Sequence, residues 1–157
     1  TLISKRKTNE QDIKAIAAKD GIISIKIKSD RMLLAYGFLR KVFEIFEIYQ
    51  TPVDVITTSE VAVSITVDNC FQLDAIVKEL SKYGSVEVEK EQSIICIVGD
   101  LIAEKKGLAK KIFNALDDVP IRMISYGGSR YNVSLLVNMA DKEKALTLLN
   151  KNLLNNE

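Results

Sequence analysis

The stretch that decides the fold occurs twice, first as Gly37-Phe38-Leu39-Arg40-Lys41-Val42-Phe43 and again as Gly107-Leu108-Ala109-Lys110-Lys111-Ile112-Phe113. In both copies apolar residues recur at intervals of three and four, which is the spacing of an amphipathic helix. A proline follows each copy, Pro52 in the first and Pro120 in the second, and opens another apolar segment. This internal repeat indicates two copies of one structural unit.

Segments of alternating apolar and polar residues surround each helix and predict strands with one buried face. The first unit is predicted to contain strands at 23–27, 52–56, 61–67 and 86–88 and helices at 36–49 and 73–80. The second is predicted to contain strands at 94–98, 120–125 and 131–137 and helices at 108–116 and 145–153. The order β-α-β-β-α-β is that of a ferredoxin-like unit. We therefore predict an α+β protein of two ferredoxin-like βαββαβ domains, with antiparallel sheets and helices on one face.

Three local signals set the predicted element ends. Asp20-Gly21 predicts a turn after the apolar segment 12–18. Asn69 with Gln72 resembles a capping box before the second helix, and Gly84 is predicted to end that helix.

The second unit lacks a closing strand, and the apolar segment 12–18 could supply it. We therefore predict a first domain at 20–91, inserted into a second domain made of 12–19 plus 92–157, with 1–11 as a linker or arm. The chain begins at Thr1 without a methionine, so we expect it to be part of a longer protein.

The composition excludes several classes of function. The 157 residues include 22 Lys+Arg and 21 Asp+Glu, a net charge of +1, which lacks the basic footprint of a nucleic-acid binder. There is no histidine, so His-based catalysis and His metal sites are excluded. Cys70 and Cys96 form no CxxC motif and fit a reducing cytoplasm. No apolar run approaches the ~20 residues of a membrane span.

Polar residues at the ends of the first unit's elements predict a site for a small charged molecule. The N–H groups of the helix that begins near Gly37 could hold a carboxylate. Asp54 and Glu60 could face it and bind a cation, which together suits a basic amino acid. The alternative is that both acidic residues are solvated turn residues. The second unit has Arg122 in the place of Asp54, so only the first unit is expected to bind such a ligand.

The residues from Arg31-Met32-Leu33 through the first repeat copy, and Val53-Asp54-Val55-Ile56-Thr57-Thr58-Ser59-Glu60-Val61, closely resemble the carboxy-terminal regulatory region of lysine-sensitive aspartokinases. Ile121-Arg122-Met123-Ile124-Ser125-Tyr126-Gly127 resembles the same region. The resemblance covers the chain from about residue 12. It implies a pair of ACT domains, the first inserted in the second.

The resemblance also implies a function: lysine binds the first ACT domain across a homodimer interface and inhibits the kinase by feedback in lysine, threonine and methionine biosynthesis. By motif match, the effector site would contain Met32, Gly37, Phe38, Leu39, Val53, Asp54, Ser59 and Glu60. Ala35 and Pro52 stand where a serine can occur, which affects the expected affinity.

The catalytic residues, ATP and Mg are expected in a kinase domain that these residues do not include. We therefore expect this part to have no catalytic residues, metal or cofactor. Its expected partners are L-lysine, a second copy and the kinase domain, with no nucleic acid and no membrane, in the cytoplasm.

Two alternatives of different kinds remain for the function. The ACT pair could act only in oligomer assembly, or it could sense a different amino acid. A ferredoxin-like RNA-binding module would need aromatic residues on the sheet face, where positions such as Ser24, Lys26, Ser64 and Thr66 are predicted. A metal chaperone would need paired soft ligands, which two distant cysteines do not provide.

Overall fold

A computed structural model of the protein describes residues 13–29, 36–68 and 70–154. The elements are β1 (Ile13–Lys28), α1 (Phe38–Ile48), β2 (Ile56–Thr58), β3 (Ala62–Asp68), α2 (Leu73–Leu80), β4 (Ser85–Gly99), α3 (Leu108–Ala115), β5 (Ile121–Ser125), β6 (Asn132–Asn138), a 3-10 turn at Met139–Asp141, α4 (Lys142–Leu149) and a π-helical turn at Asn150–Leu154.

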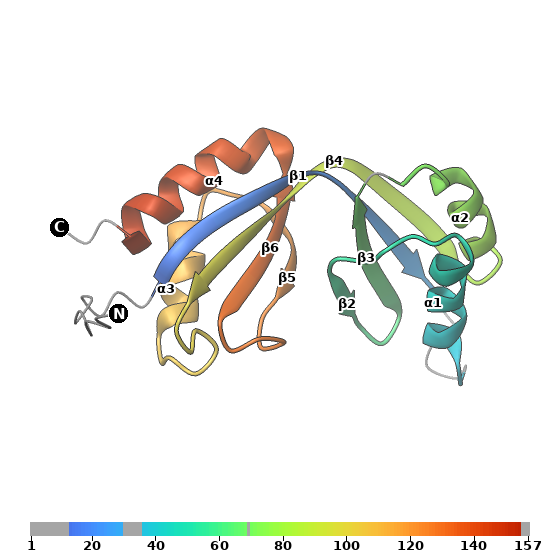
Figure 1. The fold of residues 1–157 in the computed structure, drawn as a ribbon, viewed down its shortest axis with the longest axis horizontal. Helices are drawn as coiled ribbons and strands as arrows, with labels where there is room; N and C mark the ends of the chain where they lie inside the picture. The colour runs from blue at the N-terminus through green and yellow to red at the C-terminus, as the bar shows by residue number, and fades with distance from the viewer. Residues whose placement is uncertain (1–12, 30–35, 69, 155–157) are drawn as a thin grey trace, which may run out of the picture.

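The strands form one antiparallel sheet of six strands in the order β2-β3-β1-β4-β6-β5. The two long central strands, β1 and β4, run through both halves of the molecule, as Figure 1 shows. Helices α1 and α2 cover the first half, and α3 and α4 cover the second (Figure 1). The predicted α+β class and the two ferredoxin-like units are confirmed.

The predicted turn at Asp20-Gly21 is wrong, because β1 continues through it. Gly21 has a φ of 74° and the pairing with β4 shifts register between Lys19 and Ile22, which together describe a β-bulge. Glu91, with a φ of 56°, lies within β4. A bulge bends a strand without ending it, so the strands predicted on either side of each position are joined.

The N-terminal part of β1 pairs with the second half. Ile16 lies opposite Ile97 and Ala18 opposite Ile95, in an antiparallel ladder. The apolar segment at 12–18 therefore lies on the second unit's sheet, apart from residue 12, which is outside the described residues. The domain boundaries 20–91 and 12–19 plus 92–157 stay a prediction, as does the linker at 1–11, which also lies outside the described residues.

Each half has its own hydrophobic core between the sheet and its helices. The first contains Ile25, Ile27, Val42, Val63, Ile65, Ile76 and Leu80, all fully buried. The second contains Ile95, Ile97, Ile112, Leu135, Val137 and Leu149, and Ile13 from β1 completes it. A smaller cluster of Ile22, Ile94, Met123 and Leu136, with Val55 packed against it, lies where β2 and β5 contact each other. The halves are thus linked both by shared strands and by apolar contact.

Two boundary predictions differ from the structure. The strand predicted at 52–56 is assigned as β2 at Ile56–Thr58, although the hydrogen bonds from Asp54 N to Thr66 O and from Thr66 N to Val55 O, both 2.9 Å, extend the pairing. Helix α2 has Gln72 at its N-cap, so Gln72 does not take the place within the first turn that the predicted capping box gives it; Asn69 lies outside the described residues.

Gly84 does not end α2, which stops at Leu80. Instead it lies against the end of β1: a Cβ on Gly84 would be 2.2 Å from the carbonyl oxygen of Lys28. Only a residue without a side chain permits this close approach of two backbone segments.

We expect Gly84→Ala to lower the free energy of unfolding by about 1–3 kcal/mol, because the atom it meets is backbone and must be displaced. Gly128→Ala is the matched control, since a Cβ there meets nothing within 4 Å. Urea unfolding of the two variants measures the difference. Equal urea midpoints for the two variants would show that the backbone near Lys28 moves aside without loss of stability.

Candidate functional site

The predicted anion seat lies at the start of α1. Gly37 is the N-cap of this helix, with a left-handed φ of 82°, and no side chain among the described residues caps the first turn. Phe38 is buried in the first core and Leu39 is 39% exposed. Met32 and Ala35, also named from the sequence, lie outside the described residues. The first-turn N–H groups of a helix carry partial positive charge, so this end suits an anion.

Ser59 and Glu60 lie in the turn between β2 and β3. The amide of Ser59 donates to the carbonyl of Ala62 at 2.8 Å, and both Ser59 and Glu60 are exposed. The amide of Ser29 donates to the carbonyl of Val61 at 3.0 Å, so the turn lies beside the end of β1. In Figure 1 the start of α1 lies at this same end of the first half.

Val53 and Asp54 lie at the other end of β2. Val53 packs against the first core. Asp54 pairs through its backbone with Thr66, whereas Ser59 pairs with Ala62. Four residues along β3 correspond to about 13 Å. The other end of α1 lies here too, because Tyr49 to Pro52 line a pocket together with Asp68.

One chain therefore does not bring all the predicted site residues together. Gly37, Leu39, Ser59 and Glu60 share one end of the first half, and Asp54 lies at the opposite end. The expectation that Asp54 faces the Gly37 seat within one unit is wrong for this single chain. The reason is geometric: Asp54 precedes β2 at the end where α1 stops, and β2 then runs toward the end at which α1 begins, so Ser59 and not Asp54 comes near Gly37.

Asp54 is already paired. The ammonium of Lys19 donates to its two carboxylate oxygens at 3.2 and 3.4 Å and lies 2.7 Å from Oδ2 of Asp68. The hydrogen bond between Lys19 and Asp68 is the main cause of two shifts: it lowers the pKa of Asp68 and raises the pKa of Lys19. Lys19 and Asp68 are not among the predicted site residues.

The second half has a counterpart of this pair with the charges exchanged. Arg122, at the repeat position of Asp54, has its Nε 3.8 Å from Oε2 of Glu89. Glu89 on β4 lies opposite Ser24 on β1, and Lys19 on β1 lies opposite Ile94 on β4. Because the internal repeat aligns Ser24 with Ile94, Glu89 and Lys19 occupy equivalent positions in the two halves. Both ion pairs therefore join a central strand in one half to an outer strand of the other half. The opposite charges of Asp54 and Arg122, at equivalent positions of the repeat, were the signal in the sequence that each position has an oppositely charged partner.

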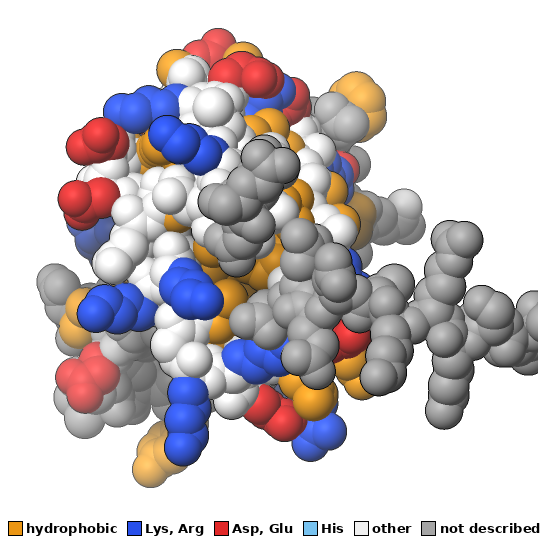
Figure 2. All heavy atoms as spheres, turned by 90° about the vertical axis from the view of Figure 1, so that its left-hand side faces the viewer, with side chains coloured by type: hydrophobic (Ala, Val, Ile, Leu, Met, Phe, Trp, Pro, Cys, Tyr) orange, Lys and Arg blue, Asp and Glu red, His pale blue; other side chains and the backbone are white. Residues whose placement is uncertain are grey.

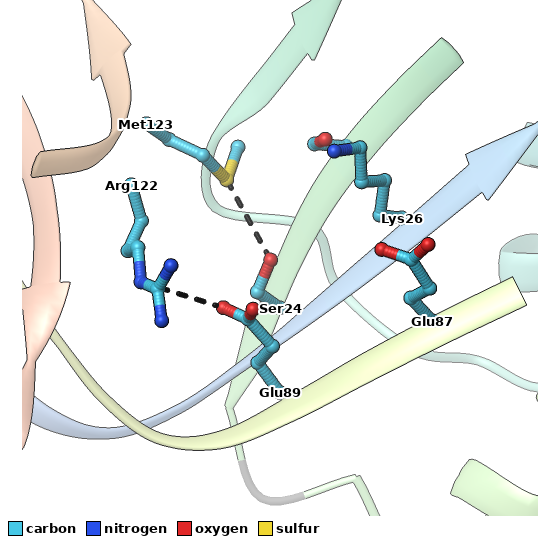
Figure 3. Close-up of a pocket in the computed structure, with 7 residues that line it drawn as sticks. Ser24, Lys26, Glu87, Glu89, Arg122 and Met123 are labelled. Carbon is cyan, nitrogen blue, oxygen red and sulfur yellow. Dashed lines mark hydrogen bonds and ion pairs between the residues drawn. The ribbon is translucent and has the colours of Figure 1, made fainter.

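A groove between the two halves contains the Arg122 pair, as Figure 3 shows. Its cavity of about 110 Å³ is lined by Ser24, Lys26, Ser64, Glu87, Glu89, Arg122 and Met123. The hydroxyl of Ser24 contacts the sulfur of Met123 at 3.8 Å. Lys28, 2.6 Å from Glu87, lowers the pKa of Glu87 through that hydrogen bond. The groove carries both signs of charge and connects the halves.

Metal-binding groups and membrane-spanning helices are both absent from the described part of the chain. No group of three or more His, Cys, Asp or Glu residues there could hold a metal ion. Within the same residues, no helix is long and apolar enough to cross a membrane. Figure 2 shows the end of the second half, where basic and acidic side chains are both present. That mixture differs from the basic surface that a nucleic-acid binder presents.

Comparison with known proteins identifies the fold family. Residues 95–153 match the family model of the ACT domain. A solved structure from Porphyromonas gingivalis W83, described as a C-terminal regulatory domain of aspartate kinase, is 56% identical, with a TM-score of 0.83 over 92% of this chain and 99% of that chain. The fold and these matches define an ACT-domain protein.

Full-length aspartokinases match over the same region. The lysine-sensitive aspartokinase 3 of Escherichia coli K12 is 32% identical over 98% of this chain and 36% of its own length. The structure of Escherichia coli aspartokinase III in complex with lysine and aspartate has a TM-score of 0.82 and 34% identity, over 95% of this chain and 35% of that one. The chain belongs to the aspartokinase family, as its C-terminal regulatory region. It spans 27% to 36% of the length of the first curated relatives.

Proposed function

We propose that this chain is an amino-acid sensor that binds L-lysine and transmits feedback inhibition to an aspartate kinase domain. The observation that carries the proposal is the pairing of Asp54 with an ammonium group, that of Lys19, in the half whose opposite end has a helix start suited to an anion. Lysine offers both charges. The lysine-sensitive Escherichia coli relative and the lysine-bound structure of that enzyme support the choice of ligand.

The separation of Asp54 from Gly37 supports a site built from two copies of the chain. Strand β2 is an outer strand of the sheet, and Ile56 within it and Val61 in the turn after it are exposed at 43% and 49%. If two β2 strands pair antiparallel about a twofold axis, the Asp54 end of each meets the Ser59 end of the other. Each lysine would then lie between Asp54 of one copy and the Gly37 end of the other.

Linkage explains how such a site regulates. A ligand that bridges two copies stabilises one arrangement of the dimer, and that arrangement would disfavour a competent kinase active site. ATP, Mg, aspartate phosphorylation and a cytoplasmic location are proposed for the whole protein, with the chemistry in a kinase domain outside these residues. A coupling of ~1–3 kcal/mol gives strong feedback.

Calorimetric titration of the dimer with lysine tests the proposal, with threonine and methionine as controls. We expect heat from lysine alone and one lysine per chain, because a twofold dimer has two equivalent sites. Heat from threonine or methionine instead would indicate a sensor of another amino acid. No heat from any of the three would leave oligomer assembly as the function of the ACT pair.

A further inference from the structure

The ammonium of Lys19 is bound to the carboxylate of Asp54, which is the group that the proposed effector would bind. Its Nζ lies 3.2 Å from Oδ1 and 3.4 Å from Oδ2 of Asp54, and 2.7 Å from Oδ2 of Asp68. The ammonium of Lys19 is the same chemical group as the side-chain ammonium of free lysine. Two ammonium groups cannot take the same position, so the effector and Lys19 compete.

We propose that Lys19 is an internal competitor for the effector, which displaces it from Asp54 on binding; this inference rests on the lysine-binding function proposed above. Lys19 sets the affinity of the site without touching the ligand in the bound state. It is therefore a residue that tunes the response to lysine.

The exchange is feasible because the contact is exposed. The side chain of Lys19 is 50% exposed and that of Asp54 31% exposed, and ion pairs with this exposure contribute little free energy. Asp68 also lowers the cost. It makes the shorter contact with Lys19 and can keep its ammonium paired when Asp54 turns to the ligand.

Displacement of Lys19 from Asp54 would also change a contact between the two halves of the molecule. Lys19 lies opposite Ile94, on the part of β1 that pairs with the second half, whereas Asp54 and Asp68 belong to the first. Lys19 directly precedes the bulge at Gly21, where β1 bends. Releasing Asp54 from Lys19 removes one of the two ion pairs that, among the described residues, join a central strand to an outer strand across the halves. The pair of Arg122 with Glu89 remains.

Lysine titration of Lys19→Met tests the proposal. We expect binding about two- to five-fold tighter than in the unsubstituted chain, the range of an exposed ion pair. Lys19→Gln serves as a second variant with a polar side chain and should shift the affinity in the same direction. Thermal unfolding checks that both variants are folded.

Two controls separate competition from other effects. Lys28→Met removes the same charge from the same strand, where Lys28 pairs with Glu87 rather than Asp54. Glu89→Gln breaks the counterpart link between the halves. Both should leave lysine affinity within about two-fold of the unsubstituted chain, because neither residue contacts Asp54. An equal gain in Lys28→Met would assign the effect to net charge, and an equal gain in Glu89→Gln to a loosened contact between halves; either result overturns the competition.

The outcomes also separate this inference from the proposed function. If the unsubstituted chain binds lysine and Lys19→Met binds it equally or more weakly, the competition is wrong and the sensor function stands. If neither protein binds lysine, the proposed sensor function is wrong, and this inference is wrong as well.

Discussion

Replacing Ile25 with alanine is expected to lower the free energy of unfolding by about 2–5 kcal/mol and to shift the melting of the whole chain. Ile25 is fully buried in the first core, opposite Ile65 on β3 and Val88 on β4. The change leaves a cavity that the packed strands and helices around it fill only in part. That cavity accounts for the upper part of the expected range.

The whole chain should respond because its two cores share β1 and β4. Ile25 and Ile13 lie on one strand but in different cores, so losing the first core removes a strand from the second. Ile95→Ala, at the repeat counterpart of Ile25, should therefore give the same single transition. Ile48→Ala is the control, since Ile48 is 68% exposed and its loss should change little.

Circular dichroism and calorimetry on the same samples measure this cooperativity. Agreement between the calorimetric and van't Hoff enthalpies would indicate one unit. Two transitions, of which Ile25→Ala moves only one, would instead show that the halves unfold independently.

The elements were predictable because each has a local cause. Alternation at Ile23, Ile25 and Ile27 reflects a strand with one face in a core, and the spacing in 37–43 reflects a helix with one face on it. The internal repeat then supplied the order of the second unit. These signals depend on neighbours within a few positions, so one sequence contains them.

The joining of the two sheets was not predictable from such local signals. Asp20-Gly21 has the composition of a turn, and only the pairing of β1 with β4 on both sides makes it a bulge. Gly84 likewise follows a helix, but the backbone of Lys28 is what excludes a side chain there. Both positions are determined by residues distant in sequence.

The candidate site was predictable in its residue types and not in its geometry. Asp54 is acidic, whereas the equivalent position of the second unit is Arg122. This difference indicated that a cation binds in the first half. The partner that the single chain supplies, Lys19, is 35 positions away and is brought near by the shared strand. The sequence could not show that Asp54 lies at the end where α1 stops, far from Gly37 at its start.

Asp54→Ala is expected to weaken lysine binding about 10- to 100-fold, the loss of a hydrogen-bonded charge partner. The proposed site has Asp54 as the carboxylate that receives an ammonium of the ligand. Stability should change little, because the side chain is partly exposed and its pair with Lys19 lies near the surface. Asp54→Asn keeps the shape of the side chain and should show most of the same loss, because the charge carries the interaction.

Arg122→Ala is the matched control for this loss. It occupies the repeat position of Asp54 and also breaks a pair across the halves, with Glu89, but it lies outside the proposed lysine site. Its lysine affinity should remain within about two-fold of the unsubstituted chain, the scale of an exposed ion pair. Calorimetric titration gives both affinities, and sedimentation shows whether each variant keeps its oligomeric state. Equal affinities of Asp54→Ala and the unsubstituted chain would remove Asp54 from the site, whereas equal losses in Asp54→Ala and Arg122→Ala would assign the effect to the junction of the halves.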